Sequence, residues 1–313
     1  MRNLLIIAVI GGVVCASAST SGGYAGAFAR IGLDARQYAL AGAVVADINT
    51  GYLANGNPAS AVFVERLEFG FSHMALPLDR SLQSLSIGFH LPPQAAVSLS
   101  YLAAGDDNIQ GRNSLGQRTE LLEYKDQQVM LSFANQVTDR ISVGINAKLL
   151  LTQVGPENAR GFAIDAGLLY HTPKGFNVGC KIENLTGSES WSVALDRGEN
   201  VYQDYLPLIF SIGTRVPWWH FAFLVQLDAF IPRIEQDSKM ALGTLVPQYH
   251  IAVEETIANR VFARIGLDNQ IPTLGAGIQY SVFSANDSRF DYGLSLGTAG
   301  EGFGHLFTWV FVL

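Results

Sequence analysis

Charged side chains recur at regular positions in a chain that is otherwise poor in charge. Only 15% of the 313 residues are Asp, Glu, Lys or Arg. Several stand on the polar side of a predicted strand, and in chain order their signs largely alternate. This set comprises Lys148, Asp165, Lys181, Glu183, Arg215, Asp228, Glu254 and Arg264. Opposite charges on neighbouring strands attract each other, so the pattern predicts ion pairs rather than catalysis.

Two of these pairs lie on either side of a predicted turn. Lys148 and Asp165 are centred on residues 155–158, whereas Glu254 and Arg264 are centred on residues 258–259. Residues at equal distances from a hairpin turn lie opposite each other. We therefore predict that these ion pairs form a ring around the lumen of a barrel. The ring would hold a hatch inside the barrel and narrow any channel. The alternative is structural charge compensation without a role in transport.

No motif of a known catalytic or metal site accompanies these charges. Neither Gly-x-Ser-x-Gly nor His-Glu-x-x-His occurs in the chain. The six histidines are scattered, and beyond residue 18 the only cysteine is Cys180. We therefore predict a protein that is not an enzyme, with no catalytic residues, no cofactor and no metal.

The elements that must position the charges are strands with strict alternation. In residues 141–152 one face carries Ile141, Val143, Ile145, Ala147, Leu149 and Leu151, and the other carries Ser142, Gly144, Asn146, Lys148 and Thr152, with Leu150 as the exception. Successive strand side chains point to opposite faces. A closed sheet with this pattern has lipid outside and a polar lumen inside.

About fourteen segments show this alternation. They are residues 65–75, 81–91, 95–104, 127–136, 141–153, 161–171, 176–185, 206–216, 219–231, 248–257, 260–268, 274–283, 290–298 and 305–313. Connections after even-numbered strands are tight, whereas 105–126, 186–205 and 232–247 are long and follow odd-numbered strands. Outer-membrane barrels have short periplasmic turns and longer external loops. We therefore predict an all-β fold, a fourteen-stranded antiparallel transmembrane β-barrel with both ends on the periplasmic side.

Composition narrows the class of protein. The body contains no run of roughly 18 uncharged apolar residues, the length of a membrane-spanning helix, which leaves a membrane barrel or a large soluble β-protein. In soluble domains about a quarter of the residues are charged, and the lower charged fraction of this chain favours the barrel. The net charge is −7, and no basic cluster occurs. These features argue against a nucleic-acid partner.

The N-terminal 64 residues do not fit the barrel pattern. A basic start at Arg2, an apolar run over 4–14 and the small residues Ala16 and Ala18 predict a signal peptide over 1–18, with a buried first strand as the alternative. Residues 19–64 are rich in Ala and Gly, and we interpret them as a hatch folded into the lumen rather than a flexible periplasmic tail. Residues 65–313 then form the barrel.

The last predicted strand alternates large apolar residues up to the final position. Phe307, Trp309, Phe311 and Leu313 lie on one face. This pattern resembles the C-terminal assembly signal of outer-membrane proteins, although Leu313 stands where Phe is usual, and the alternative is an ordinary core strand. The resemblance implies outer-membrane lipid and the barrel-assembly machinery as partners.

A family resemblance rests on the N-terminal segment. Residues 27–32, 34–36, 39–46 and 57–59 are similar to the N-terminal signature of the PorV/PorQ outer-membrane barrels, which are related to the FadL transporters. The hatch-motif residues are Arg36, Gly42, Asn57, Pro58 and Ala59. Gly56 and Ser60 depart from the group, which usually has Trp and often Gly at these positions.

The resemblance implies two functions in the bacterial outer membrane. The first is an accessory role in type IX-like protein secretion or surface attachment, with secreted proteins docking on the external loops. The alternative is FadL-like passive transport of hydrophobic small molecules, with hatch movement at residues 57–58. A general diffusion porin is a third possibility, against which the apolar hatch argues.

Overall fold

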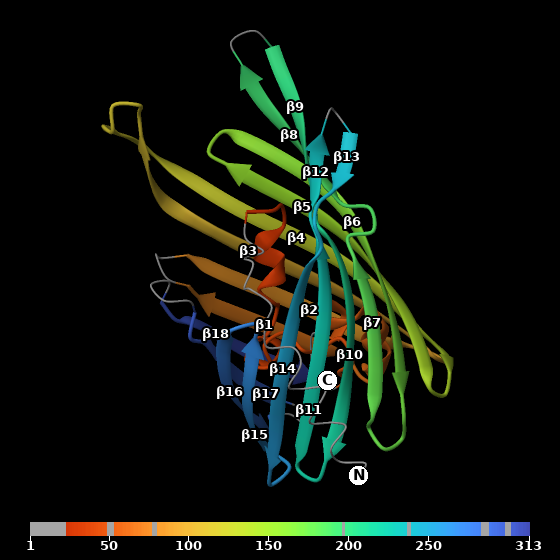
Figure 1. Ribbon diagram of the computed structural model, residues 1–313. Helices are drawn as coiled ribbons and strands as arrows, with labels where there is room; N and C mark the ends of the chain where they lie inside the picture. The colour runs from red at the N-terminus through yellow and green to blue at the C-terminus, as the bar shows by residue number, and fades with distance from the viewer. Residues whose placement is uncertain are drawn as a thin grey trace.

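The computed structural model describes residues 23–48, 53–76, 80–195, 198–236, 239–282, 288–297 and 302–313. Its main body is one antiparallel sheet of sixteen strands (Figure 1). Two of them, β8 and β9, form a hairpin attached to β6, and the other fourteen close into a barrel because β1 pairs with β18 and β5 pairs with β6. The predicted fourteen-stranded antiparallel barrel is confirmed. The predicted signal peptide, residues 1–18, lies outside the described residues.

The wall strands match the fourteen predicted segments one for one. They are β1 Glu68–Ala75, β2 Ser81–Leu91, β3 Ala95–Arg112, β4 Arg118–Thr138, β5 Ile141–Val154, β6 Glu157–His171, β7 Asn177–Glu183, β10 Leu208–Trp218, β11 Phe221–Ile231, β14 Val246–Ile257, β15 Val261–Asp268, β16 Ile271–Tyr280, β17 Ser288–Ser295 and β18 Gly304–Val312. None of the helices in the described part of the chain has the length and hydropathy of a membrane-spanning helix.

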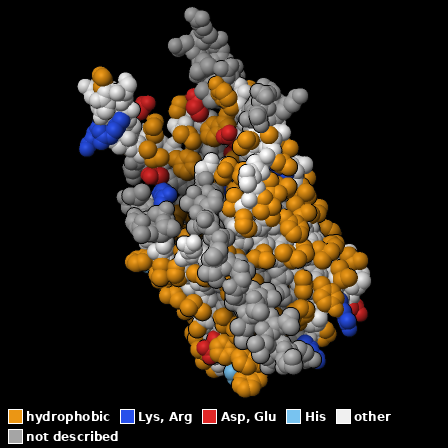
Figure 2. All heavy atoms as spheres, viewed as in Figure 1, with side chains coloured by type: hydrophobic (Ala, Val, Ile, Leu, Met, Phe, Trp, Pro, Cys, Tyr) orange, Lys and Arg blue, Asp and Glu red, His pale blue; other side chains and the backbone are white. Residues whose placement is uncertain are grey.

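The wall is apolar outside and polar inside. On β5 the aliphatic side chains Ile145 and Leu149 are 54% and 45% exposed, whereas Ser142 and Asn146 are buried. Hydrophobic side chains cover the flank of the molecule in the space-filling view (Figure 2). Leu150, which breaks the alternation in the sequence, faces inward and packs against Ala163 and Leu206.

The described part of the predicted hatch lies inside the barrel. We call residues 23–48 and 53–64 the inner segment. It contains η1 Ala27–Arg30, α2 Ala35–Ala39, α3 Leu53–Gly56 and η2 Pro58–Phe63, drawn in red and orange within the ring of strands (Figure 1). The helices are short, so most of the segment's backbone polar groups need partners other than helical hydrogen bonds.

The wall supplies many of these partners. Ser84 of β2, Thr273 of β16 and Asn146 of β5 donate to carbonyl oxygens of the inner segment at 2.7, 2.9 and 3.0 Å. Thr308 of β18 and Gln226 of β11 accept from backbone N–H groups at 2.8 and 2.9 Å. Strands on all sides of the barrel therefore bind the inner segment.

Glycines of the wall let the inner segment approach closely. A Cβ atom added at Gly167 of β6 would lie 2.0 Å from Asn57 Oδ1, and one at Gly179 of β7 would lie 2.0 Å from the Val45 carbonyl oxygen. On the opposite side, a Cβ at Gly275 of β16 would lie 2.3 Å from the Ala39 Cβ. No side chain fits at these positions, so the glycines act as seats for the inner segment.

The three long connections contain more strand than the sequence suggested. Within 105–126, β3 and β4 continue to Arg112 and from Arg118 as one long hairpin. Region 186–205 forms the hairpin of β8 Ser188–Leu195 and β9 Gly198–Tyr205, and region 232–247 contains β12 Arg233–Gln236 and β13 Lys239–Leu242. The prediction of loops was wrong here because each arm satisfies its backbone hydrogen bonds on its partner.

Candidate functional site

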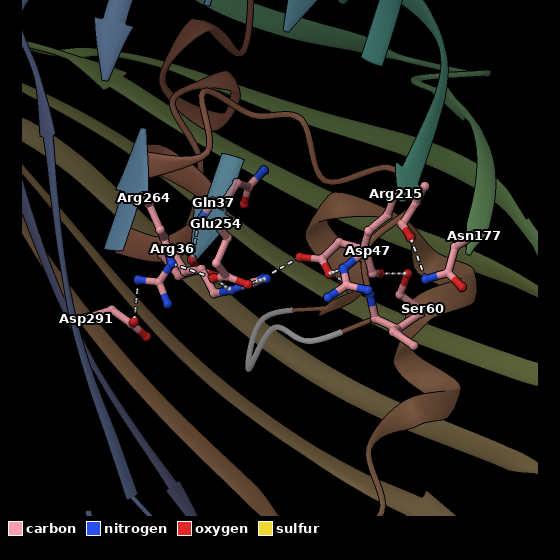
Figure 3. A network of polar contacts seen from close by, with 12 residues as sticks. Arg36, Gln37, Asp47, Ser60, Asn177, Arg215, Glu254, Arg264 and Asp291 are labelled. Carbon is pink, nitrogen blue, oxygen red and sulfur yellow. Dashed lines mark hydrogen bonds and ion pairs between the residues drawn. The ribbon is translucent and has the colours of Figure 1, made fainter. Parts of the chain in front are cut away.

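Arg36 is the centre of a buried ion network in the lumen (Figure 3). It lies on α2 with 1% of its surface exposed. Its Nε and Nη2 atoms donate to Oε2 and Oε1 of Glu254 on β14 at 2.9 and 2.8 Å, and its Nη1 atom pairs with Asp47 of the inner segment. The two-pronged bond to Glu254 is the strong, directional form of an Arg–carboxylate pair.

The network continues along the wall in both directions. Glu254 also accepts from Arg264 Nε on β15 at 2.7 Å, and Arg264 Nη1 donates to Asp291 on β17 at 2.7 Å. Asp47 lies 3.5 Å from Arg215 Nε on β10. Cations and anions therefore alternate from β17 to β10, with the inner segment inserted at the centre.

Full pairing explains how so many charges are buried together. Isolated ions are expensive to bury, whereas paired and hydrogen-bonded ions are tolerated. Burial disfavours the charged guanidinium of Arg36, but the carboxylates of Asp47 and Glu254 outweigh this effect and hold its pKa well above the usual value. Arg36 therefore stays charged, and the network joins the inner segment to the wall.

The predicted motif 57–59 forms a second joint, beside β6. Asn57 caps η2, since its Oδ1 accepts from the Ala59 N–H at 3.0 Å, and Pro58 occupies the start of the helix. The Asn57 Nδ2 atom donates to the carbonyl oxygens of Val45 at 2.7 Å and Leu168 at 3.2 Å. Ser60, a departure from the family pattern, donates its hydroxyl to the Asp47 carbonyl at 2.9 Å.

The other predicted lumen charges form local pairs. Lys148 Nζ lies 2.7 Å from Asp165 Oδ1, and Lys181 Nζ lies 2.7 Å from Glu183 Oε1. Both pairs predicted from the hairpins are thus in contact. They are Lys148 with Asp165, and Glu254 with Arg264, which lie directly opposite each other in the register of β14 and β15. Asp228 pairs instead with a histidine that sequence reasoning had passed over.

That histidine is His250 on β14. Its Nε2 lies 3.2 Å from Asp228 and its Nδ1 lies 3.1 Å from Asp268 and 2.7 Å from the Ala41 carbonyl. Gly42, whose φ is +80°, lets the inner segment turn beside the imidazole ring of His250. His250 is 22 residues from Asp228 in the chain, and the pairing of β11 with β14 brings them together.

A cavity of about 530 Å³ lies on the external side of the inner segment. It is bordered by strand ends that carry the long connections and by the turn between β15 and β16. Its polar lining includes Arg30, Lys181, Glu183, Asp228, His250 and Asp268. Apolar side chains, among them Val44, Ile209 and Ile271, line it as well. Burial lowers the pKa of Arg30 to about 10.

The remaining predicted residues lie away from this site. On β18, Trp309 faces outward and its ring contacts those of Phe71 and Phe290 at centroid distances of 6.0 and 4.9 Å. Phe307 stacks near Phe290, and Leu313 is exposed at the end of the chain. Within the described ranges no group of three or more His, Cys, Asp or Glu side chains is arranged to hold a metal ion.

Solved structures of other proteins share this fold. CymD, described as a monoaromatic hydrocarbon channel, has a TM-score of 0.63 at 14% identity, covering 90% of this chain and 98% of its own. The toluene transporter TbuX of Ralstonia pickettii gives 0.59 at 14% identity over 90% and 98% of the chains, and a FadL homologue of Pseudomonas aeruginosa gives 0.54 at 10% identity over 89% and 97%. No family model and no curated protein matches the chain.

These likenesses show the fold, an antiparallel β-barrel like those of CymD, TbuX and the FadL homologue. CymD and TbuX are described as a channel and a transporter, not as enzymes. Membership of the PorV/PorQ group is not shown by any of these comparisons.

Proposed function

We propose that the protein is a passive outer-membrane channel for small molecules that are largely apolar, and that the external cavity is where a solute first binds. The observation that carries the proposal is the cavity itself, closed below by the inner segment and lined by strand ends of the lumen. Its volume of about 530 Å³ lies within the range of roughly 300–1,000 Å³ of small-molecule sites. The printed descriptions of CymD and TbuX, a hydrocarbon channel and a toluene transporter, support the same solute class.

The lining favours a molecule with one polar end. Ile209 and Ile271 offer apolar contact, and charges of both signs lie beside them. A purely polar solute would gain little from the aliphatic side chains, whereas an apolar body with a polar group can use both parts. In this proposal the inner segment serves as the hatch of the channel.

The test fills the cavity. Ile209 of β10 faces the lumen and is 5% exposed, whereas Ile212 of the same strand faces lipid and is 42% exposed. Cells that lack their own hydrocarbon channels would express the wild-type chain, Ile209→Trp or the matched control Ile212→Trp. We expect the wild type and Ile212→Trp to accelerate uptake of labelled toluene and decanoate, and Ile209→Trp to return uptake to the level of cells without the protein.

A second blocking variant guards against misfolding. Ile271→Trp fills the cavity from the turn between β15 and β16, and the heat-dependent electrophoretic shift of folded barrels verifies assembly of every variant. Uptake unchanged by both folded blocking variants would overturn the proposal.

The secretion role receives no support from the structural neighbours reported above. It stays a prediction from the N-terminal resemblance, as do secreted proteins and the assembly machinery as partners. Copurification of a large secretion complex from native membranes would favour that role over transport.

A further inference from the structure

A second hollow lies on the outer surface, at the base of the external hairpins. This crevice of about 620 Å³ is formed by β5, β6, the start of the β8–β9 hairpin and the β12–β13 hairpin. Its apolar lining includes Leu149, Phe162, Leu185 and Met240, and its two cations are Arg160 and Arg233. The crevice is separate from the luminal cavity.

The apolar part faces the bilayer. Leu149 and Phe162 are 45% and 52% exposed on the outer face of β5 and β6. Arg160 lies on the same face of β6, one side-chain step nearer the external end of the strand. The crevice therefore offers apolar contacts towards the middle of the bilayer and a cation towards its external surface. This arrangement matches the acyl chains and the anionic headgroup of an outer-leaflet lipid.

In the part of the chain that the structure describes, the two arginines lack the acidic partners that the luminal arginines have. Arg233 is 8% exposed, donates Nη2 to the Leu185 carbonyl at 3.2 Å, and has an Nε atom with no acceptor. Among the described residues neither Arg160 nor Arg233 forms an ion pair. A buried guanidinium donor without an acceptor is costly, so the site favours an added anion.

We propose that this crevice binds a phosphorylated, acylated lipid of the outer leaflet. The phosphate accepts from Arg233 Nε and from the Arg160 guanidinium, since planar guanidinium groups suit phosphate oxygens. An acyl chain lies along Leu149 and Phe162. Because Leu149 and Phe162 face the bilayer directly beside Arg160, a lipid can place its acyl chain and its phosphate on both parts at once, which is why we assign a membrane lipid.

The test is native mass spectrometry of the purified full-length protein in a mild non-ionic detergent. The ligand is lipid A with its phosphates, compared with the same lipid after phosphatase treatment. The variants are Arg160→Gln, Arg233→Gln and the double variant. The matched control is Arg140→Gln, an exposed arginine at a periplasmic turn. Heat-shift electrophoresis verifies folding, and Arg160→Gln, an exposed position, serves if loss of Arg233 impairs assembly.

We expect the double variant to bind phosphorylated lipid A at least about tenfold more weakly, because the phosphate loses its charge-assisted hydrogen bonds to both guanidinium groups. Arg140→Gln should bind as the wild type does, and phosphatase treatment should weaken wild-type binding similarly. Equal affinity of the double variant, or no preference of the wild type for phosphate, would overturn the proposal. So would displacement of lipid A by decanoate with the same arginine dependence, since the crevice would then be a solute site.

Discussion

The ion network around Arg36 and the external cavity use the same residue types in opposite ways. In the network, Arg36 and Glu254 are almost fully buried, and each bonds to two oppositely charged partners. At the cavity, Lys181, Asp228 and His250 border open space above the inner segment. The cavity charges are paired as well, but with other residues of the wall. The comparison teaches that ion pairs between the inner segment and the wall fix one layer of the lumen, whereas ion pairs within the wall leave the next layer available to a ligand.

The largest expected effect comes from breaking the network at its centre. Arg36→Met leaves Glu254 and Asp47 with one fewer cation in a buried site. Removing one partner of a buried pair costs about 3–5 kcal/mol, so the free energy of unfolding measured by urea titration in lipid vesicles should fall by that amount. The control Arg140→Met, at an exposed turn, should change stability by less than about 0.5 kcal/mol.

The alternative outcome would be informative. If Arg36→Met had the same urea midpoint of unfolding as the wild type, the network would not hold the inner segment. The contrast between a fixed layer and an available layer of the lumen would then be wrong.

The next effect comes from filling a glycine seat. Gly179→Ala places a methyl group at the Val45 carbonyl, whereas at Gly88 an added Cβ would meet its neighbours at an ordinary 3.6 Å. Overpacking costs about 1–3 kcal/mol. We expect Gly179→Ala to lower stability by that amount and to expose the inner segment to protease in detergent, with Gly88→Ala as the control. Equal protease resistance of both variants would show that the wall strand moves to accommodate the methyl group and that the inner segment stays in place.

The sequence was sufficient for the barrel because its signal is local and repeated. Alternation such as that of Ile145 and Asn146 defines both faces of each strand, and the tight turns define the strand count. The pairs Lys148 with Asp165 and Glu254 with Arg264 were within reach for the same reason, since each spans a single hairpin.

The centre of the network was out of reach because it depends on where the inner segment lies against the wall. Asp47 is a lone acid in an apolar stretch, and nothing local indicates that it meets Arg36 and Arg215. His250 lacked neighbouring ligands in sequence, yet the sheet places it between Asp228 and Asp268. The external strands were missed since they extend the hairpins beyond the alternating segments of the wall, and β8 adds to the outer part of β6.

A smaller loss of stability should follow from removing the cap of η2. Asn57→Ala deletes the acceptor for the Ala59 N–H and the donor to the Val45 carbonyl. Loss of a helix cap costs about 0.5–2 kcal/mol, and urea titration should show a decrease within that range. The control is Asn113→Ala, whose side chain caps an exposed turn. A larger decrease for Asn113→Ala than for Asn57→Ala would contradict the proposed joint between inner segment and wall.

The smallest effect concerns the available layer. Asp268 borders the cavity with 41% of its side chain exposed, so Asp268→Asn should leave stability almost unchanged, as exposed pairs contribute about 0–1 kcal/mol. It should instead alter solute preference, because one unit charge at contact distance in water contributes about 1 kcal/mol. We expect the uptake ratio of a protonated aromatic amine to a neutral aromatic molecule of equal size to fall by about fivefold or less. Glu120→Gln, the same charge change on the exposed part of β4, is the control, and an equal change in both variants would show that the field of the whole external face, rather than the cavity, selects the solute.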